Sequence, residues 1–119
     1  MKFAYYGQYM RWFEIGRAEY MRARGLSYAE VERRGTFLPV HEAYCKYRRP
    51  IRYDDLISIE AWPDNLRKVS AQFNYRLLDA KERVLATGYT VHVCMDRDGR
   101  MVRMPDFLAE ALSAGASEL

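Results

Sequence analysis

The sequence predicts a single α+β domain in which a long helix precedes a four-stranded antiparallel sheet. Apolar residues between Tyr9 and Arg24 recur at three- and four-residue spacing, as they do on one face of a helix. From Thr36 to Met95 the apolar period falls to two, which is typical of strands, and short polar turns interrupt it. The length of 119 residues allows one hydrophobic core, so residues 1–119 are expected to form one domain.

The long helix is expected to cover the sheet with its apolar stripe and to end before Gly25, a residue type that favours helix termination. The stripe consists of Tyr9, Trp12, Phe13, Gly16 and Tyr20. The opposite face is charged and is expected to form surface ion pairs. Its pairs at i,i+3 spacing are Glu14 with Arg17 and Glu19 with Arg22.

Two shorter helices flank the predicted sheet. The first spans Ser27 to Arg34, because Ser27 and Glu30 form a capping box that stabilises a helix start by ~1 kcal/mol. The second opens at Pro105, whose missing N–H is tolerated in the first turn, and ends near Ser113.

Four segments with strand patterns lie between these helices: Thr36–Arg49, Leu56–Trp62, Val69–Leu77 and Arg83–Met95. Turn chemistry follows the last three, at Pro63–Asn65, Asp79–Glu82 and Asp96–Gly99. Pro50 suits the end of the first strand because it cannot donate to a ladder. Tight turns between strands predict an antiparallel meander, and its unpaired edges predict dimerisation by edge pairing.

Composition limits the classes of function. The net charge of +3 is carried mainly by arginine and fits a phosphate-bearing small molecule better than a long polyanion. Ten tyrosines and two tryptophans indicate an interface, an aromatic cleft or a tyrosine-rich core. No segment approaches the ~18 consecutive apolar residues of a membrane helix, and the first residues lack the apolar run of a signal peptide. A soluble, cytoplasmic protein is expected.

Neither the cysteines nor the histidines indicate metal or redox chemistry. Cys45 and Cys94 each fall inside a strand-like segment and are expected to be core residues with inert thiols. His41 and His92 form no ligand spacing with them, which argues against a zinc site.

Four motifs resemble those of the 4-hydroxybenzoyl-CoA thioesterase and YbgC-like families. In chain order they are Y-Y-G-Q-Y-M-R-W-F-E (residues 5–14, with Arg17 and Glu19 beyond it), L-P-V with Y-x-x-P-x-x-Y-D-D-L (38–40 and 47–56), R-K-V-S (67–70) and A-T-G-Y-T-V-H-V (86–93). Their order and separations match the families from Phe3 to about Leu108.

The resemblance implies a hotdog fold, in which an antiparallel sheet wraps around a long central helix. It implies an acyl-CoA thioesterase that uses no metal or cofactor, forms a homodimer or homotetramer, binds acyl-CoA at the shared edge, and has neither nucleic acid nor membrane as a partner. In the family, an aspartate of a D-x-x-G segment just before the helix acts on the thioester directly or through water. The N–H groups at the helix start meanwhile polarise the carbonyl.

The chain departs from the family pattern at its start. When it is aligned on residues 5–7, Met1 and Lys2 occupy the last two positions of the D-x-x-G segment. The catalytic aspartate then falls two residues before Met1, and the first strand of the fold is missing or truncated. One hypothesis is that Met1 is an internal methionine, which translation of the upstream codons would test. The alternative function is a non-catalytic acyl-CoA or acyl-carrier-protein binding module of the same fold.

The resemblance also assigns site residues. Tyr5, Tyr6 and Gly7 match positions that line the thioester site, and a glycine lets substrate approach the backbone closely. Taken without the resemblance, they are an ordinary helix entry. Tyr9 is assigned to substrate binding beside them. The resemblance also assigns a basic pair, Arg67 and Lys68, to binding of the CoA phosphates. The alternative is that these two side chains belong to a solvated turn between strands.

Glu14 is a second candidate for the catalytic carboxylate, because another branch of hotdog thioesterases uses a glutamate of the central helix. Against this, Arg17 is placed to hold Glu14 as an ion pair. Asp54–Asp55 is expected to be a strand-entry corner that bonds local backbone.

Thr90 and His92 would share one strand face in packing or interface roles. A small RNA-binding domain is the remaining alternative function. Phe73 and Tyr75 fall on the apolar strand face, which argues against it.

Overall fold

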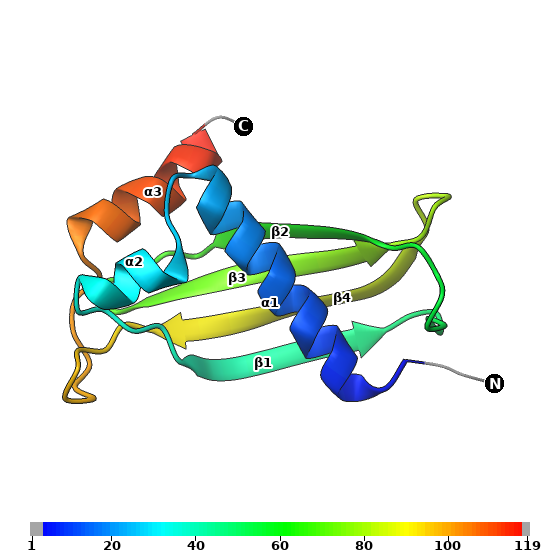
Figure 1. Ribbon diagram of the computed structural model, residues 1–119, viewed down its shortest axis with the longest axis horizontal. Helices are drawn as coiled ribbons and strands as arrows, with labels where there is room; N and C mark the ends of the chain where they lie inside the picture. The colour runs from blue at the N-terminus through cyan, green and yellow to red at the C-terminus, as the bar shows by residue number, and fades with distance from the viewer. Residues whose placement is uncertain (1–3, 118–119) are drawn as a thin grey trace.

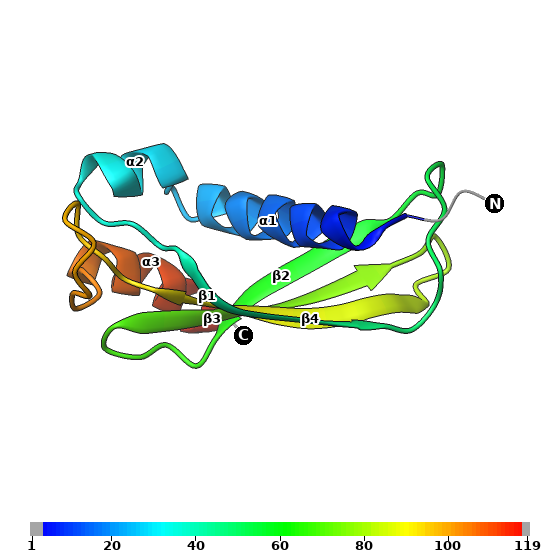
Figure 2. The same cartoon turned by 90° about the horizontal axis from the view of Figure 1, so that it is seen from below.

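Two layers make up the structure, a four-stranded antiparallel sheet and helix α1, which crosses one face of that sheet (Figure 1, Figure 2). The computed structural model describes residues 4–117, with side chains as far as residue 113. The elements are α1 (Tyr6–Ala23), α2 (Tyr28–Arg33), β1 (Val40–Tyr47), β2 (Ser58–Asp64), β3 (Ser70–Leu78), β4 (Val84–Val93) and α3 (Asp106–Ser117). The predicted α+β class is confirmed.

The strand order β1-β4-β3-β2 corrects the predicted meander. Strands β2, β3 and β4 are sequential neighbours, but β1 pairs with β4, with Cys45 opposite Gly88. Residues 48–57 carry the chain from one edge of the sheet to the other (Figure 1). The N–H groups of Arg48 and Arg49 donate to the Leu85 carbonyl and hold the end of β1 against β4. Alternating polarity shows which face of a strand is buried, but it does not name the neighbouring strand.

Each predicted helix is present with shifted ends. Helix α1 begins at Tyr6 rather than Tyr9. Ser27 caps α2 by accepting a hydrogen bond from the Glu30 N–H at 3.1 Å, which confirms half of the predicted capping box. Helix α3 begins one residue after Pro105. No helix within residues 4–117 is long and apolar enough to cross a membrane.

The strand ends differ more. Strand β1 is shorter than the predicted Thr36–Arg49, and outside it Phe37 forms an isolated bridge with Met95. Strand β2 continues through Pro63, which was predicted to begin a turn. Because β2 is an edge strand, a residue without an N–H is tolerated in it. The turn comes at Asn65, which has φ +49°.

The core lies between α1 and the sheet. The Phe13 ring of α1 stacks on the Tyr75 ring of β3 with centroids 4.4 Å apart. Phe73 is also buried, as the alternation in β3 predicted. Gly88 provides the space for the Phe13 ring, since a Cβ added there would lie 2.6 Å from a ring carbon and even closer to the Tyr44 carbonyl oxygen.

Gly88→Ala is therefore expected to lower the free energy of unfolding by about 1–3 kcal/mol, because neither the strand backbone nor the stacked ring can move aside without strain. Urea denaturation measures the change. Thr87→Ala is the matched control, because Thr87 is the preceding residue of β4 and points to the opposite face. A loss below about 0.5 kcal/mol for Gly88→Ala would contradict this account of the packing.

Helices α2 and α3 close one end of the core. Leu108 and Leu112 of α3 are buried, and the Arg34 guanidinium lies 4.4 Å from the centroid of the Phe107 ring. Cys94 is buried and Cys45 half-buried, and burial raises the pKa of both thiols. The predicted core placement of the cysteines is thus confirmed for Cys94 and partly for Cys45.

Candidate active site

The start of α1 offers backbone donors without a side-chain acceptor. Tyr5 is the N-cap residue, in extended backbone conformation, and no side-chain hydrogen bond caps the helix in the described part of the chain. The first turn contains no acidic residue. A helix start leaves N–H groups unpaired within the helix and carries the positive end of its dipole. This arrangement suits an oxygen atom that bears negative charge.

Three of the predicted site residues gather at this helix start. Tyr5 and Tyr6 are 68% and 74% exposed. The Tyr5 ring folds back over Gly7, because a Cβ added at Gly7 would lie 2.9 Å from the Tyr5 hydroxyl. Tyr9 is only 4% exposed and packs edge-to-face on Tyr47 of β1, with centroids 4.6 Å apart. Tyr9 is therefore a core residue that packs on Tyr47, the ring that the exposed Tyr6 also contacts.

A cavity lined by charged residues of both signs, which the sequence patterns did not predict, lies at the same end of the sheet. The Ala4 N–H donates to the Ile51 carbonyl at 2.7 Å and ties the helix entry to the loop of residues 48–57. That loop and the β3–β4 turn line a cavity of about 660 Å³. Its charged walls are Arg49, Arg52, Lys81 and Arg83 together with Asp54, Asp55 and Asp79. Because these residues come from two separate loops, only the cluster of arginines at 48, 49 and 52 signalled it in the sequence.

The predicted acidic corner forms within this loop. The Asp55 carboxylate accepts a hydrogen bond from the Arg52 N–H at 2.9 Å. Asp55 is thus engaged in local turn geometry, as predicted.

Arg67 and Lys68 lie in the β2–β3 connection, at the opposite end of the sheet from the start of α1 (Figure 1). The Arg67 N–H donates to the Ser70 carbonyl at 2.8 Å, and the Lys68 carbonyl accepts from the Met104 N–H at 2.7 Å. Their side chains share a cavity of about 400 Å³ with Arg103. Within one chain they are not brought to Tyr6 and Gly7.

The predicted ion pair between Glu14 and Arg17 is wrong. No ion pair among the described residues involves Arg17, which is 8% exposed instead of lying on the helix surface. Its Nε donates to the Tyr28 hydroxyl and its Nη1 donates to the Tyr75 hydroxyl, the latter at 2.8 Å. The i,i+3 spacing would allow Arg17 to pair with Glu14, but hydrogen bonds to the two tyrosine hydroxyls hold the guanidinium between α1 and the sheet.

The other predicted helix pair, Glu19 with Arg22, does form, with 2.6 Å between the carboxylate oxygen and the guanidinium nitrogen.

A chain of hydrogen bonds continues from Arg17 across the sheet. The Tyr75 hydroxyl lies 2.6 Å from Thr90 Oγ1, which lies 2.8 Å from His92 Nε2. His92 Nδ1 lies 2.9 Å from the Leu38 carbonyl oxygen. A carbonyl only accepts, so Nδ1 carries the proton and Nε2 accepts from Thr90. Thr90 then accepts from Tyr75, and every bond in the chain has one direction.

The side chains in this chain of hydrogen bonds each have one protonation state at pH 7. Burial, reinforced by the nearby charge of Arg17, lowers the pKa of His92 to about 4, so the ring is neutral at pH 7. Burial raises the pKa of the Tyr28 and Tyr75 hydroxyls, which therefore stay protonated. The predicted packing role of Thr90 and His92 is confirmed, together with their common strand face.

Comparisons with known proteins agree with this architecture. The family model described as the thioesterase-like superfamily matches residues 3–112. The acyl-CoA thioester hydrolase YbgC of Escherichia coli is 25% identical over 92 residues, which cover 77% of this chain and 69% of that protein.

Solved structures match closely in fold. The crystal structure of a hypothetical protein from Thermus thermophilus has a TM-score of 0.88 and 30% identity, covering 96% of this chain and 87% of that one. The DHNA-CoA thioesterase from Staphylococcus aureus has a TM-score of 0.90 and 26% identity, covering 98% and 81%. The chain therefore belongs to the thioesterase-like superfamily and has the hotdog architecture of a sheet packed around a long helix.

Proposed function

We propose that this chain is an acyl-CoA thioester hydrolase that releases free CoA and a carboxylic acid. The observation that carries the proposal is the start of α1, which is uncapped by side chains, free of acidic residues in its first turn and flanked by exposed tyrosines. A thioester carbonyl set against these N–H groups gains stabilisation as its oxygen becomes negative in the transition state. Membership of the thioesterase-like superfamily supports the same reaction.

The predicted site residues have distinct roles in this proposal. Gly7 allows the thioester to approach the backbone once the Tyr5 ring, which lies over Gly7, is displaced by the substrate. Tyr6 and the buried Tyr9 form an aromatic wall with Tyr47, whose ring centroid lies 5.8 Å from that of Tyr6.

The CoA phosphates are assigned to Arg67 and Lys68 of a second copy. Suppose that β1 pairs antiparallel with β1 of another chain, so that the two sheets run in opposite directions. The β2–β3 connection of one copy and the start of α1 of the other copy then lie at the same end of the joined sheet. A dimer therefore reconciles the basic pair with the start of α1, which one chain alone does not.

Hydrolysis is tested with a panel of acyl-CoAs by measuring release of free thiol. We expect turnover, and we expect Gly7→Ala to lower kcat/KM about 10-fold, because the added methyl displaces Tyr5 and obstructs the carbonyl. Ile15→Ala is the control, since Ile15 is a half-exposed residue of the same helix about 12 Å along its axis from Gly7. Acyl-CoA binding without thiol release, both by this chain and by one extended upstream to carry a D-x-x-G segment, would contradict the proposal and favour a non-catalytic binding module.

The reacting carboxylate has two candidates. Glu14 lies eight residues after Tyr6, which is about 12 Å along the helix axis. It is exposed and lines a different cavity from the start of α1. The resemblance instead assigns the carboxylate to an aspartate before Met1, and Met1 and Lys2 lie outside the described residues.

Glu14→Gln is therefore expected to change turnover less than about threefold, whereas loss of a general base costs 10²–10⁴-fold. The assay is again thiol release from acyl-CoA. A chain extended upstream to carry a D-x-x-G segment is expected to hydrolyse faster. Equal rates for the two lengths would contradict the assignment of an upstream aspartate.

Dimerisation through β1 is proposed because that strand is an edge with exposed side chains along most of its length. Sedimentation is expected to give twice the 14.1 kDa chain mass. Adjacent residues of a strand direct their N–H groups to opposite edges, and proline has no N–H. Of Glu42→Pro and Ala43→Pro, the variant that loses an N–H on the free edge should give a folded monomer. The variant that loses an N–H on the β4 edge should disrupt the pairing of β1 with β4. A monomeric wild-type chain at tens of micromolar would contradict this assembly.

A further inference from the structure

Arg17 is a buried cation that contacts only neutral acceptors. Two of its five N–H donors are used, one by the Tyr28 hydroxyl and one by the Tyr75 hydroxyl. None of the ion pairs formed within the described residues includes it. Burying a guanidinium away from water lowers the stability of the folded protein strongly unless an anion pairs with it. Arg17 therefore has both the charge and the remaining donors to bind one.

A cavity of about 560 Å³ opens onto this cation between α1, α2 and the β4–α3 loop. The buried Arg17 and the half-buried Tyr28 supply its polar end. Because the Tyr28 hydroxyl accepts from Arg17 Nε, its own proton is directed away from Arg17 and is available to a ligand. The apolar walls are Phe37, Leu38, Pro39 and Met95.

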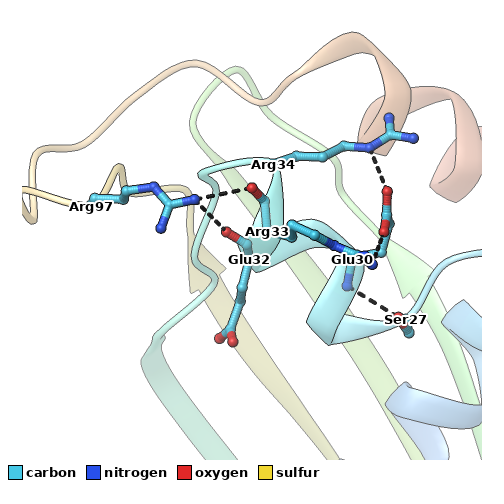
Figure 3. Close-up of polar contacts among 6 residues, drawn as sticks. All are labelled: Ser27, Glu30, Glu32, Arg33, Arg34 and Arg97. Atoms are coloured by element: carbon cyan, nitrogen blue, oxygen red, sulfur yellow. Dashed lines mark hydrogen bonds and ion pairs between the residues drawn. The ribbon is translucent and has the colours of Figure 1, made fainter.

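The rim of the cavity is acidic and its remaining cation is engaged. Arg97 donates to the carbonyl oxygens of Arg33 and Glu32 at 3.0 and 3.4 Å, and so holds the end of α2 (Figure 3). The side chain of Glu32 takes no part in these bonds. Glu14, Glu32 and Asp96 surround the opening and disfavour a ligand with several negative charges.

The cavity is separate from the start of α1. Arg17 lies eleven residues after Tyr6, a distance of about 16 Å along the helix axis. A ligand carboxylate on Arg17 is therefore too far from the first-turn N–H groups to be the reacting group of the same molecule.

We propose that this cavity binds a monocarboxylate with an apolar body, with the carboxylate on the Arg17 guanidinium and the Tyr28 hydroxyl and the hydrocarbon along Leu38 and Met95. A planar carboxylate matches the fork of guanidinium donors, and the hydroxyl adds a third donor. One negative charge neutralises Arg17 with the least repulsion from the rim. The acids released by thioester hydrolysis belong to this class, but binding here does not depend on that reaction.

Calorimetric titration of the full chain at pH 7 with octanoate and with octan-1-ol tests the proposal. We expect octanoate to bind at least about 10-fold more tightly than the alcohol. Arg17→Gln should weaken octanoate at least 10-fold and Tyr28→Phe about 5-fold, whereas Glu14→Gln should strengthen it by removing a like charge. Equal affinity for acid and alcohol, or unchanged affinity after Arg17→Gln, would overturn the site.

A second variant separates binding from general stability. Thr90→Val removes the next hydroxyl of the buried chain but does not line the cavity, so it should lower stability and leave octanoate affinity unchanged. If it weakens octanoate as much as Tyr28→Phe does, the effect passes through the fold and the site is rejected. If Arg17→Gln does not fold, the other two variants decide whether the site exists, because Tyr28→Phe should weaken octanoate binding and Glu14→Gln should strengthen it. No thioester is present, so a chain without hydrolytic activity gives the same answer.

Discussion

Phe13→Ala is expected to lower the free energy of unfolding by about 3–5 kcal/mol. Phe13 has no exposed surface, and its ring is stacked on Tyr75 with an interplanar angle of 6°. Gly88, the cross-strand neighbour of Tyr75, also contacts this ring and has no side chain that could fill the cavity left by it. The contacts between α1 and the sheet therefore cannot close over the loss.

Urea or thermal unfolding of the two proteins measures this difference. Ile15→Ala serves as the control, because Ile15 lies two residues along the same helix and is half-exposed. We expect that control to cost less than about 1 kcal/mol. A Phe13→Ala loss no greater than that of Ile15→Ala would show that α1 does not depend on this ring for its attachment.

His92 is expected to make the stability depend on pH between about 6.5 and 4. Burial lowers its pKa to about 4 in the folded chain, against the ordinary value of 6.5 when unfolded. Between these values the unfolded chain binds a proton that the folded chain does not, so stability falls as the pH falls. The slope approaches 1.36 kcal/mol per pH unit, and the full loss is about 3 kcal/mol by pH 4.

Unfolding measured in urea from pH 7 to pH 4 tests this dependence. His92→Gln removes the titrating ring and should flatten the curve relative to wild type over this window. His41 is the only other histidine and is exposed, so His41→Gln should retain the wild-type slope. Equal slopes for wild type and His92→Gln would show that carboxylates, rather than this ring, cause the acid sensitivity.

Much of the candidate active site was foreseeable from the sequence. The motif at residues 5–14 identified Tyr5, Tyr6 and Gly7, which do lie together at the start of α1. The alternation of β3 identified Phe73 and Tyr75 as core residues. The positions of these residues could be predicted because each depends on neighbours in the chain or on a short period, whereas the roles of Tyr5, Tyr6 and Gly7 in the reaction stay predictions.

The residue that the sequence misplaced is Arg17, whose partners are distant in the chain. Arg17 was predicted on the helix surface because its spacing from Glu14 suits an ion pair, yet its partners come from α2 and β3. For Arg67 and Lys68, which the resemblance assigned to the CoA phosphates, the sequence did not indicate that they lie at the opposite end of the sheet from the start of α1.

The sequence by itself determined the order of helices and strands, the buried face of β3 and membership of the thioesterase-like superfamily. Only the tertiary structure decided that β1 lies beside β4, that a cation is buried under α1 and that the helix start is left uncapped by side chains. The physical reason is that the spacing of apolar residues and the secondary-structure propensities depend on each residue and its neighbours in the chain. The choice of a neighbouring strand or a buried partner depends instead on packing between residues far apart in the chain.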